Sequence, residues 1–303
     1  MPGNWPLSKR RRALTERGAI FNKIRAFFQE KGYLEVETPF RIPAPAPETH
    51  IDAITSAGWF LQTSPELCMK RMLAAGYQRI FQICRCWREG ERGVRHLSEF
   101  TMLEWYRAGA DYFDLMDETE ALVNAAAGVP RIPYRGLDIE LALPWERITV
   151  AEAFRLYSDS TVSEALDAGL FDEIMVERIE PRLGLTRPTF IYDYPPCCAA
   201  LARLKKGDAT VAERFELYIG GLEIANAFSE LIDPEEQRTR FEAAAAERSS
   251  YGKAAYPVPE KFLAALADMP ESAGIALGLD RLVMVLLDAE CIDDVVAFTT
   301  EEL

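Results

Sequence analysis

The feature that most restricts the possible folds is a pair of alternating apolar segments, 213–219 and 222–230, joined by only Gly220 and Gly221. A two-residue glycine connection is typical of a tight β-hairpin, because the favoured turns need positive φ, which glycine adopts without strain. We therefore expect two neighbouring antiparallel strands here. Further strands are expected at 33–39, 59–63, 80–87, 99–107 and 189–193. Since helices separate these strands in blocks, the order favours an α+β fold with an antiparallel sheet flanked by helices.

The expected helices lie at both ends and in the middle of the chain. Their ranges are 17–31, 65–75, 111–127, 234–251 and 282–287, the last after a turn of small residues at 274–281. Segment 130–187 has a weaker pattern, and we interpret it as a helical insertion on the main fold. Its short helices are expected near 149–158, 161–167 and 171–182. No linker is long enough to demand a second domain, so residues 1–303 are expected to form a single domain.

Composition limits the classes of function. The net charge of −14 argues against a broad nucleic-acid surface, which needs clustered Lys and Arg. No apolar run approaches the length of a membrane span, and Met1–Arg12 lacks the apolar core of a secretion signal. The six cysteines and two histidines lack zinc-ligand spacing, so reduced thiols are the better interpretation. Together these observations predict a cytoplasmic protein with no membrane partner.

One local basic cluster departs from this acidic composition. It consists of Lys9, Arg10, Arg11, Arg12, Arg17, Lys23 and Arg25. Two interpretations are open. The cluster is either the solvated face of the first helix or a docking patch for an acidic partner.

The hairpin places two carboxylates close together. With the glycine pair as the turn, Tyr218 pairs with Glu223, and Glu216 shares a face with Tyr218 because strand side chains alternate. Glu216 and Glu223 are then diagonal neighbours, roughly 7–8 Å apart at the backbone. Carboxylates so placed repel each other, which indicates a cation between them, or that both face water or meet arginines such as Arg214. Mg²⁺ is the favoured cation, since it takes one or two carboxylates plus substrate phosphates.

The residues that follow on the second strand raise a geometric problem. Asn226, Phe228 and Glu230 alternate among themselves, but in a regular strand they face away from Glu223. For all four side chains to line one pocket, a β-bulge is needed between residues 223 and 226. The sequence alone does not prove such a bulge.

A charged loop, 88–98, and the strand after it form a second candidate constellation. Arg88 at a strand end can donate a fork of hydrogen bonds to a phosphate or carboxylate. Phe100 can stack on a base, and Glu104 shares one strand face with Tyr106, a carboxylate beside a phenol that suits an alkylammonium group. Each residue also has an ordinary structural role available, in the core or in a salt bridge. The joint pattern is much less easily accidental.

The stretch Gly274–Arg281 forms a third constellation. Gly278 allows backbone to approach a ligand closely, and a helix N-terminus carries a partial positive charge. Arg281 adds a planar, permanently charged fork suited to phosphate. Considered alone, the stretch is equally consistent with a glycine-containing helix cap and a surface arginine.

Taken together, these motifs resemble those of the class II aminoacyl-tRNA synthetases over essentially the whole chain. Cys86–Tyr106 resembles motif 2, Gly274–Arg281 resembles motif 3, and Tyr33–Pro39 resembles motif 1, which forms the dimer interface in that family. Three stretches are similar to the lysyl branch, namely Thr63–Leu67, Glu99–Glu104 and Gly221–Leu231. The resemblance implies an ATP-dependent, AMP-forming ligase that is a homodimer.

Two features resemble the elongation factor P lysine ligases, stand-alone paralogues that attach lysine, typically (R)-β-lysine, to a protein lysine. Motif 1 begins about thirty residues into the chain, so we expect no anticodon-binding domain before it, and Ala276 replaces a glycine of the synthetases. The resemblance therefore implies elongation factor P as acceptor, with tRNA an improbable partner. The alternatives are a truncated lysyl-tRNA synthetase that charges tRNA and a non-catalytic regulatory paralogue.

The resemblance also implies roles for individual residues. It implies an ATP site formed by Arg88, Glu89, Gly90, His96, Leu97, Phe100, Glu216, Glu223, Ile224, Gly278 and Arg281. It implies a lysine or β-lysine site formed by Ser64, Pro65, Glu66, Glu104, Tyr106, Asn226, Phe228, Glu230 and Ala276. Within these sets, Arg88 and Arg281 would be catalytic, and Glu216 and Glu223 would bind Mg²⁺.

One position departs from the family pattern. The family usually has Glu two residues after the motif 2 arginine, where this chain has Gly90. Recognition of the adenine 6-amino group would then pass to Glu89, Glu91 or the main chain.

Overall fold

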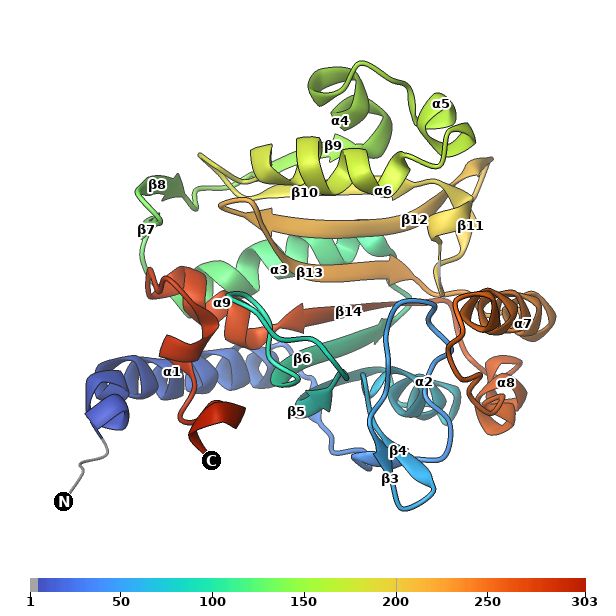
Figure 1. Ribbon diagram of the computed structural model, residues 1–303, viewed down its shortest axis with the longest axis horizontal. Helices are drawn as coiled ribbons and strands as arrows, with labels where there is room; N and C mark the ends of the chain where they lie inside the picture. Colours follow the sequence, from blue (N-terminus) through green and yellow to red (C-terminus); the bar gives the residue numbers. More distant parts are fainter. Residues whose placement is uncertain (1–4, 200) are drawn as a thin grey trace.

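The computed structural model describes residues 5–199 and 201–303, and within them a mixed sheet of nine strands forms the centre of the molecule (Figure 1). The strands are β1 (Leu34–Glu35), β5 (Arg79–Trp87), β6 (Glu99–Ala108), β14 (Ser272–Gly278), β13 (Leu222–Ser229), β12 (Asp208–Ile219), β10 (Thr189–Tyr194) and β9 (Glu146–Thr149) in spatial order, with β11 (Leu204–Lys205) on β12. The pairings from β5 to β10 are antiparallel, and only β1 with β5 and β9 with β10 are parallel among them. The expected α+β fold is confirmed.

Helices surround this sheet in three groups (Figure 1). Helices α1 (Trp5–Glu30), α3 (Tyr112–Ala127) and α9 (Leu279–Leu286) contribute to the main core against the sheet. Helices α2 (Glu66–Ala74), α7 (Pro234–Ser250) and α8 (Glu260–Leu266) pack together beside β6. Helices α4 (Val150–Tyr157), α5 (Val162–Asp167) and α6 (Phe171–Ile174) lie above β10 and β12.

Short elements complete the chain. Two small sheets are formed by β2 (Arg41–Ile42), β4 (Trp59–Leu61) and β3 (Thr55–Ser56), and by β7 (Arg131–Tyr134) and β8 (Leu137–Glu140). Short helical turns are η1 (Met175–Ile179), η2 (Glu180–Arg182), η3 (Pro196–Cys198), η4 (Ile292–Val295) and η5 (Thr300–Glu302). Among the described residues, no helix combines the length and apolar character that a membrane crossing requires.

Strand alternation separates the core from the face that carries polar residues. On β12, Phe215 and Leu217 are fully buried in the main core, whereas Glu216 and Tyr218 point to the other face and hydrogen bond to each other. Glu118 is a buried carboxylate beside this core, and it accepts hydrogen bonds from Tyr33 Oη at 2.6 Å and Trp105 Nε1 at 3.0 Å. Because a buried carboxylate is costly unless it is hydrogen-bonded, these two donors make its burial tolerable.

The hairpin predicted from the glycine pair is confirmed. Gly220 and Gly221 have φ of 61° and 70°, and Tyr218 pairs with Glu223. Further along the two strands, Leu217 pairs with Ala225, so Ile224 is an extra residue on β13. This is the β-bulge that a shared pocket needs between residues 223 and 226, and it restores Asn226, Phe228 and Glu230 to the face of Glu223.

The stretch 274–278 was expected to be a turn, but it is part of the central strand β14. Its small residues are explained by close packing, because a Cβ at Gly274 would lie 2.2 Å from the Tyr106 ring and 2.5 Å from Glu230 Oε1. A run of small residues therefore marks crowding over a sheet here, and not a change of chain direction.

Other expectations need smaller corrections. The strand expected at 33–39 is reduced to the two residues of β1, and helix α8 was not predicted. Segment 130–187 contains helices at the expected places, but also strands β7, β8 and β9, so it is not purely helical. Since β9 pairs with β10, this segment also extends the main sheet.

Candidate active site

One cavity opens on the polar face of the sheet, between β6, β13 and β14, and it collects most of the predicted site. It is lined by the predicted residues Ser64, Glu66, Arg88, His96, Leu97, Phe100, Glu104, Tyr106, Glu223, Ile224, Asn226, Phe228, Ala276, Gly278 and Arg281. They come from the start of α2 and the residues before it, from the loop 88–98, from strands β6, β13 and β14, and from the first turn of α9. The bulge on β13 is what allows Glu223 and Asn226 to line the same cavity.

At one end of the cavity lies a buried carboxylate. Glu104 is 1% exposed, and it accepts hydrogen bonds from Ser64 Oγ and from Tyr106 Oη, the latter at 3.0 Å. Burial raises the pKa of Glu104 to about 8, and the nearby Glu66 carboxylate adds to the increase. A ligand ammonium group would replace the missing countercharge, so this end of the cavity is suited to an amine.

A lysine that the sequence analysis did not single out lies behind this end. Lys70 Nζ is 2.6 Å from Glu66 Oε1 and 2.5 Å from Glu230 Oε2. Glu230, which was expected to contact the substrate ammonium group, does not line the cavity and is held by an ion pair with Lys70. The spacing of Glu66 and Lys70, four residues apart on one helix, is the sequence signal that could have indicated this pair.

At the other end, two arginines face the cavity. Arg281 donates to the Glu223 carbonyl at 2.9 Å and to Glu223 Oε2 at 3.1 Å, and it contacts His96 Nε2. Burial, together with the Arg281 charge, lowers the pKa of His96, so its ring is neutral and can accept this hydrogen bond. Arg88 lies 5.2 Å from the Phe100 ring. Its buried Nε has no hydrogen-bond partner among residues 5–199 and 201–303.

The position of Arg281 follows from how α9 is attached. Its neighbour Asp280 is 1% exposed and accepts the Thr101 backbone N–H at 2.7 Å. Asp280 also pairs with Arg17 of α1 at 2.5 Å. The first turn of α9 is thereby fixed against β6 and α1, and Arg281 in that turn is directed into the cavity.

The two carboxylates predicted to hold a cation are neighbours in the structure. Glu223 lines the cavity, whereas Glu216 lies just behind it and accepts from Arg214 at 2.7 Å and from Tyr194 and Tyr218 at 2.8 Å each. Burial raises the pKa of Glu216; Arg214 opposes this effect and Glu223 adds to it. The two carboxylates therefore repel each other.

Whether Mg²⁺ fits these residues depends on their remaining lone pairs. A carboxylate has about four acceptor sites, and three hydrogen bonds on Glu216 leave one free. Glu223 shares its carboxylate with Arg281 only, as far as the described residues go. In the described part of the chain, no group of three or more potential protein ligands is found. This donor set fits Mg²⁺, which usually takes one or two carboxylates with substrate phosphates and waters.

Some predicted residues are not brought into the cavity. Pro65, Glu89, Gly90, Glu216 and Glu230 do not line it, and Glu89 and Gly90 are exposed. Glu91, in contrast, does line the cavity, with its carboxylate 3.8 Å from Arg88. Of the sequence alternatives for reading the adenine amino group, Glu91 is the carboxylate that the fold presents. The lining also includes Glu48 and Arg95, which the sequence analysis had not identified.

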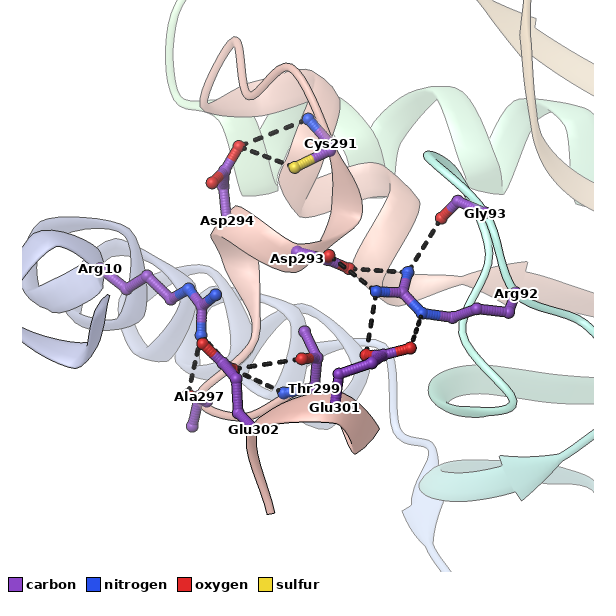
Figure 2. A network of polar contacts seen from close by, with 10 residues as sticks. All are labelled: Arg10, Arg92, Gly93, Cys291, Asp293, Asp294, Ala297, Thr299, Glu301 and Glu302. Carbon is purple, nitrogen blue, oxygen red and sulfur yellow. Dashed lines mark hydrogen bonds and ion pairs between the residues drawn. The ribbon is translucent and has the colours of Figure 1, made fainter. Parts of the chain in front are cut away.

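The loop 88–98 is tied to the C-terminal segment (Figure 2). Arg92 donates to both oxygens of Asp293, at 3.0 and 2.8 Å, and to Glu301 at 2.8 Å. The Ile292 N–H also donates to the Val94 carbonyl at 2.9 Å. These contacts attach the loop, which lines the cavity, to the C-terminal segment.

Much of the N-terminal basic cluster is used within the chain. Arg10 pairs with Glu302 at 2.7 Å, as Figure 2 shows, and Arg25 pairs with Glu35 at 2.9 Å. Arg17 pairs with Asp280, and Lys23 donates to the Ala126 carbonyl at 3.0 Å. Arg11 and Arg12 are exposed. The contacts of Arg10, Arg17, Lys23 and Arg25 favour the interpretation of this cluster as part of a structural helix.

Comparison with known proteins identifies the class of protein that has this fold and this cavity. A family model described as tRNA synthetases class II (D, K and N) matches residues 7–302. Among curated relatives, the elongation factor P–(R)-β-lysine ligase of Proteus mirabilis is 40% identical, with 97% of each chain covered. Those of Erwinia tasmaniensis and Haemophilus influenzae are each 39% identical, with 98% of each chain covered. The chain therefore belongs to the class II tRNA synthetases of this group and, within it, to the family of the elongation factor P–(R)-β-lysine ligases.

Proposed function

We propose that this protein uses ATP to activate lysine or (R)-β-lysine as an aminoacyl-adenylate and transfers it to a lysine of elongation factor P in the cytoplasm. The observation that supports this proposal is that the two ends of one cavity carry opposite charges. Glu104 at one end suits an ammonium group, and Arg88 with Arg281 at the other suits phosphates. A lysine-like amino acid and a nucleotide can meet only between these two ends. The names of the curated relatives support the same substrate and acceptor.

In the first step, a carboxylate oxygen of the amino acid attacks the α-phosphorus of ATP, and the bond to pyrophosphate breaks. The carboxylate is already ionised at neutral pH, so no catalytic base is required. Arg88 would orient the carboxylate and the α-phosphate, and Arg281 the outer phosphates. Glu216 and Glu223 would hold Mg²⁺, which neutralises developing charge on the phosphates when bound.

The rest of the cavity would place the two substrates. Phe100 would lie against the adenine, and Glu91 is available for its 6-amino group, since Gly90 lacks a side chain. Glu104 and Tyr106 would take the side-chain ammonium group, and Asn226 the carboxylate. Ala276, on the central strand, would shape the pocket near the substrate amine.

In the second step, the amine of an acceptor lysine attacks the acyl carbon. The bond from that carbon to AMP breaks, and the amine nitrogen loses one proton. The net products are AMP, pyrophosphate and an acceptor extended by one amide-linked residue.

The acceptor can be tested directly. Incubating the protein with ATP, (R)-β-lysine and elongation factor P is expected to add one β-lysyl mass to the factor, detected by intact-mass spectrometry. A parallel reaction contains lysine tRNA in place of the factor, and (R)-β-lysine is expected to modify the factor faster than α-lysine does. An unmodified factor beside charged tRNA would identify a truncated synthetase instead, and no adenylate in either reaction would indicate a regulatory paralogue.

We also propose that the protein is a homodimer. Strand β1 lies at one end of the sheet order, next to β5, and Leu34 is 50% exposed. An edge strand with an exposed apolar side chain is a site for association with another chain. Light scattering at micromolar concentration is expected to give twice the chain mass of 34.1 kDa. A monomer mass would contradict the proposal, and an Leu34→Glu variant is expected to shift the equilibrium towards monomer.

A further inference from the structure

Lys70 is a cation built into the amine end of the cavity. Its side chain is 1% exposed, with the ammonium group between Glu66 and Glu230, and it lies 4.9 Å from the Phe228 ring. Burial alone would lower the pKa of Lys70, but the two carboxylates outweigh it and raise the pKa above its usual value. Lys70 is therefore charged in the folded protein. Neither the first nor the second chemical step described above uses this residue.

The charges around Lys70 can be counted from the elements packed against it. Its own helix, α2, supplies Glu66; strand β6 supplies Glu104 and Tyr106; and the residue after β13 supplies Glu230. When all of them are ionised, the three carboxylates and the one ammonium group leave a net charge of −2 in a buried space. Glu48, which also lines the cavity, adds a carboxyl group that interacts with Glu66, and burial raises its pKa to about 7. Glu230 Oε1 is buried and has no hydrogen-bond partner among the described residues, so the network is incomplete without a further donor.

We propose that Lys70 determines which ligand charge this cavity binds best. Lys70 neutralises one of the three buried carboxylates, so a ligand with two ammonium groups balances the charge of the other two. Lys70 would also position Glu66 and Glu230, because it joins both carboxylates through one ammonium group. This inference rests on the proposed function for the chemical class of substrate, but its test needs neither ATP nor an acceptor.

The pH dependence of binding follows from the same charges. The pKa values of Glu104 and Glu230 are raised to about 8, chiefly by burial, while Lys70 lowers both. Below pH 8 the empty cavity therefore holds protons on these carboxyl groups, and a dication must displace them to bind. Affinity for a diamine is expected to rise as the pH increases through 8, with protons released on binding. Removing Lys70 would move this midpoint to higher pH, since the carboxylates would then hold their protons more strongly.

The test uses 1,5-diaminopentane, which has the two ammonium groups of lysine without its carboxylate, and 1-aminopentane, which has one. Dissociation constants are measured by calorimetry from pH 6 to 9, in two buffers with different ionisation heats. The wild-type chain is expected to bind the diamine on the order of 100-fold more tightly than the monoamine at pH 8. Lys70→Met is expected to lose on the order of 100-fold in diamine affinity and to show a higher midpoint pH.

Arg71→Met is the matched control, because Arg71 is the next residue of α2 and is exposed; its binding curve is expected to match that of the wild type. Lys70→Gln keeps hydrogen-bond donors without the charge, and it replaces Lys70→Met should that variant not fold. An unchanged midpoint pH in the variant that folds, or equal affinity for the two amines in the wild type, would overturn the inference. Selective diamine binding without modification of elongation factor P would instead keep the inference and refute the proposed function.

Discussion

Replacing Arg281 by alanine is expected to slow ATP–pyrophosphate exchange with lysine or β-lysine by about two orders of magnitude or more. Arg281 is the cation that the first turn of α9 directs into the cavity, and removing a charged donor from a buried site costs several kcal/mol of transition-state stabilisation. Glu223→Ala is expected to cause a loss of similar size. Labelled-pyrophosphate exchange measures the adenylation step alone, without elongation factor P.

The contact between the two side chains sharpens this prediction. Arg281 Nη1 and Glu223 Oε2 are 3.1 Å apart, so the two substitutions remove parts of one unit, and the double variant is expected to lose less than the sum of the single losses. Arg238→Ala is a suitable control, because this exposed arginine of α7 pairs only with Glu260 among the ion pairs of the described residues. Near-normal exchange in either single variant would show that the residue is not part of the phosphate site.

Norleucine is expected to be activated more slowly than lysine or β-lysine by a factor on the order of 10⁴. It has nearly the shape of lysine but lacks the side-chain ammonium group. Glu104 would then face an apolar methyl group within the cavity, with Ser64 and Tyr106 as its only hydrogen-bond donors among the described residues. A buried polar site left without its partner rejects an analogue far more strongly than an apolar pocket does.

The measurement is again pyrophosphate exchange, with kcat/KM compared between the two amino acids. Glu104→Gln is expected to reduce the discrimination, because it removes the charge while keeping the approximate shape of the side chain. Glu99→Gln, the same change at an exposed residue of β6 that does not line the cavity, is the matched control and should retain the wild-type ratio. Comparable activation of norleucine by the wild type would show that Glu104 does not receive the ammonium group.

Local patterns predicted the parts of the site that depend on neighbouring residues. The turn at Gly220 and Gly221 predicted the register of the hairpin next to the turn. A shared pocket for Glu223 and Asn226 then needed a bulge between residues 223 and 226, which the structure contains at Ile224. Strand β14 could not be predicted in this way. Gly274 is explained by the Tyr106 ring and the Glu230 carboxylate, which come from β6 and from the residue after β13. A local interpretation of Gly274 as a turn residue was therefore wrong for a tertiary reason.

The ion pairs at the cavity also could not be predicted from local sequence patterns. The family resemblance implied that Glu230 binds the substrate ammonium group, but in the structure Lys70 forms an ion pair with Glu230. That contact depends on how α2 packs against the sheet and cannot be inferred from α2 or from the residues around Glu230 alone. Glu91 illustrates a second case: the sequence left it as one of several adenine contacts, and only the path of the loop shows that it lines the cavity while Glu89 does not.

The position of strand β14 has a consequence for how the protein is made. This strand, Ser272–Gly278, is hydrogen-bonded between β6 and β13 and joins the two halves of the sheet. During synthesis, both flanking strands leave the ribosome long before it does, and each presents an unpaired edge to its surroundings. The two ends of the cavity can meet only after 278 of 303 residues have been translated. A nascent chain halted before that point should carry separate half-sheets, depend on chaperones for solubility, and have no adenylating activity.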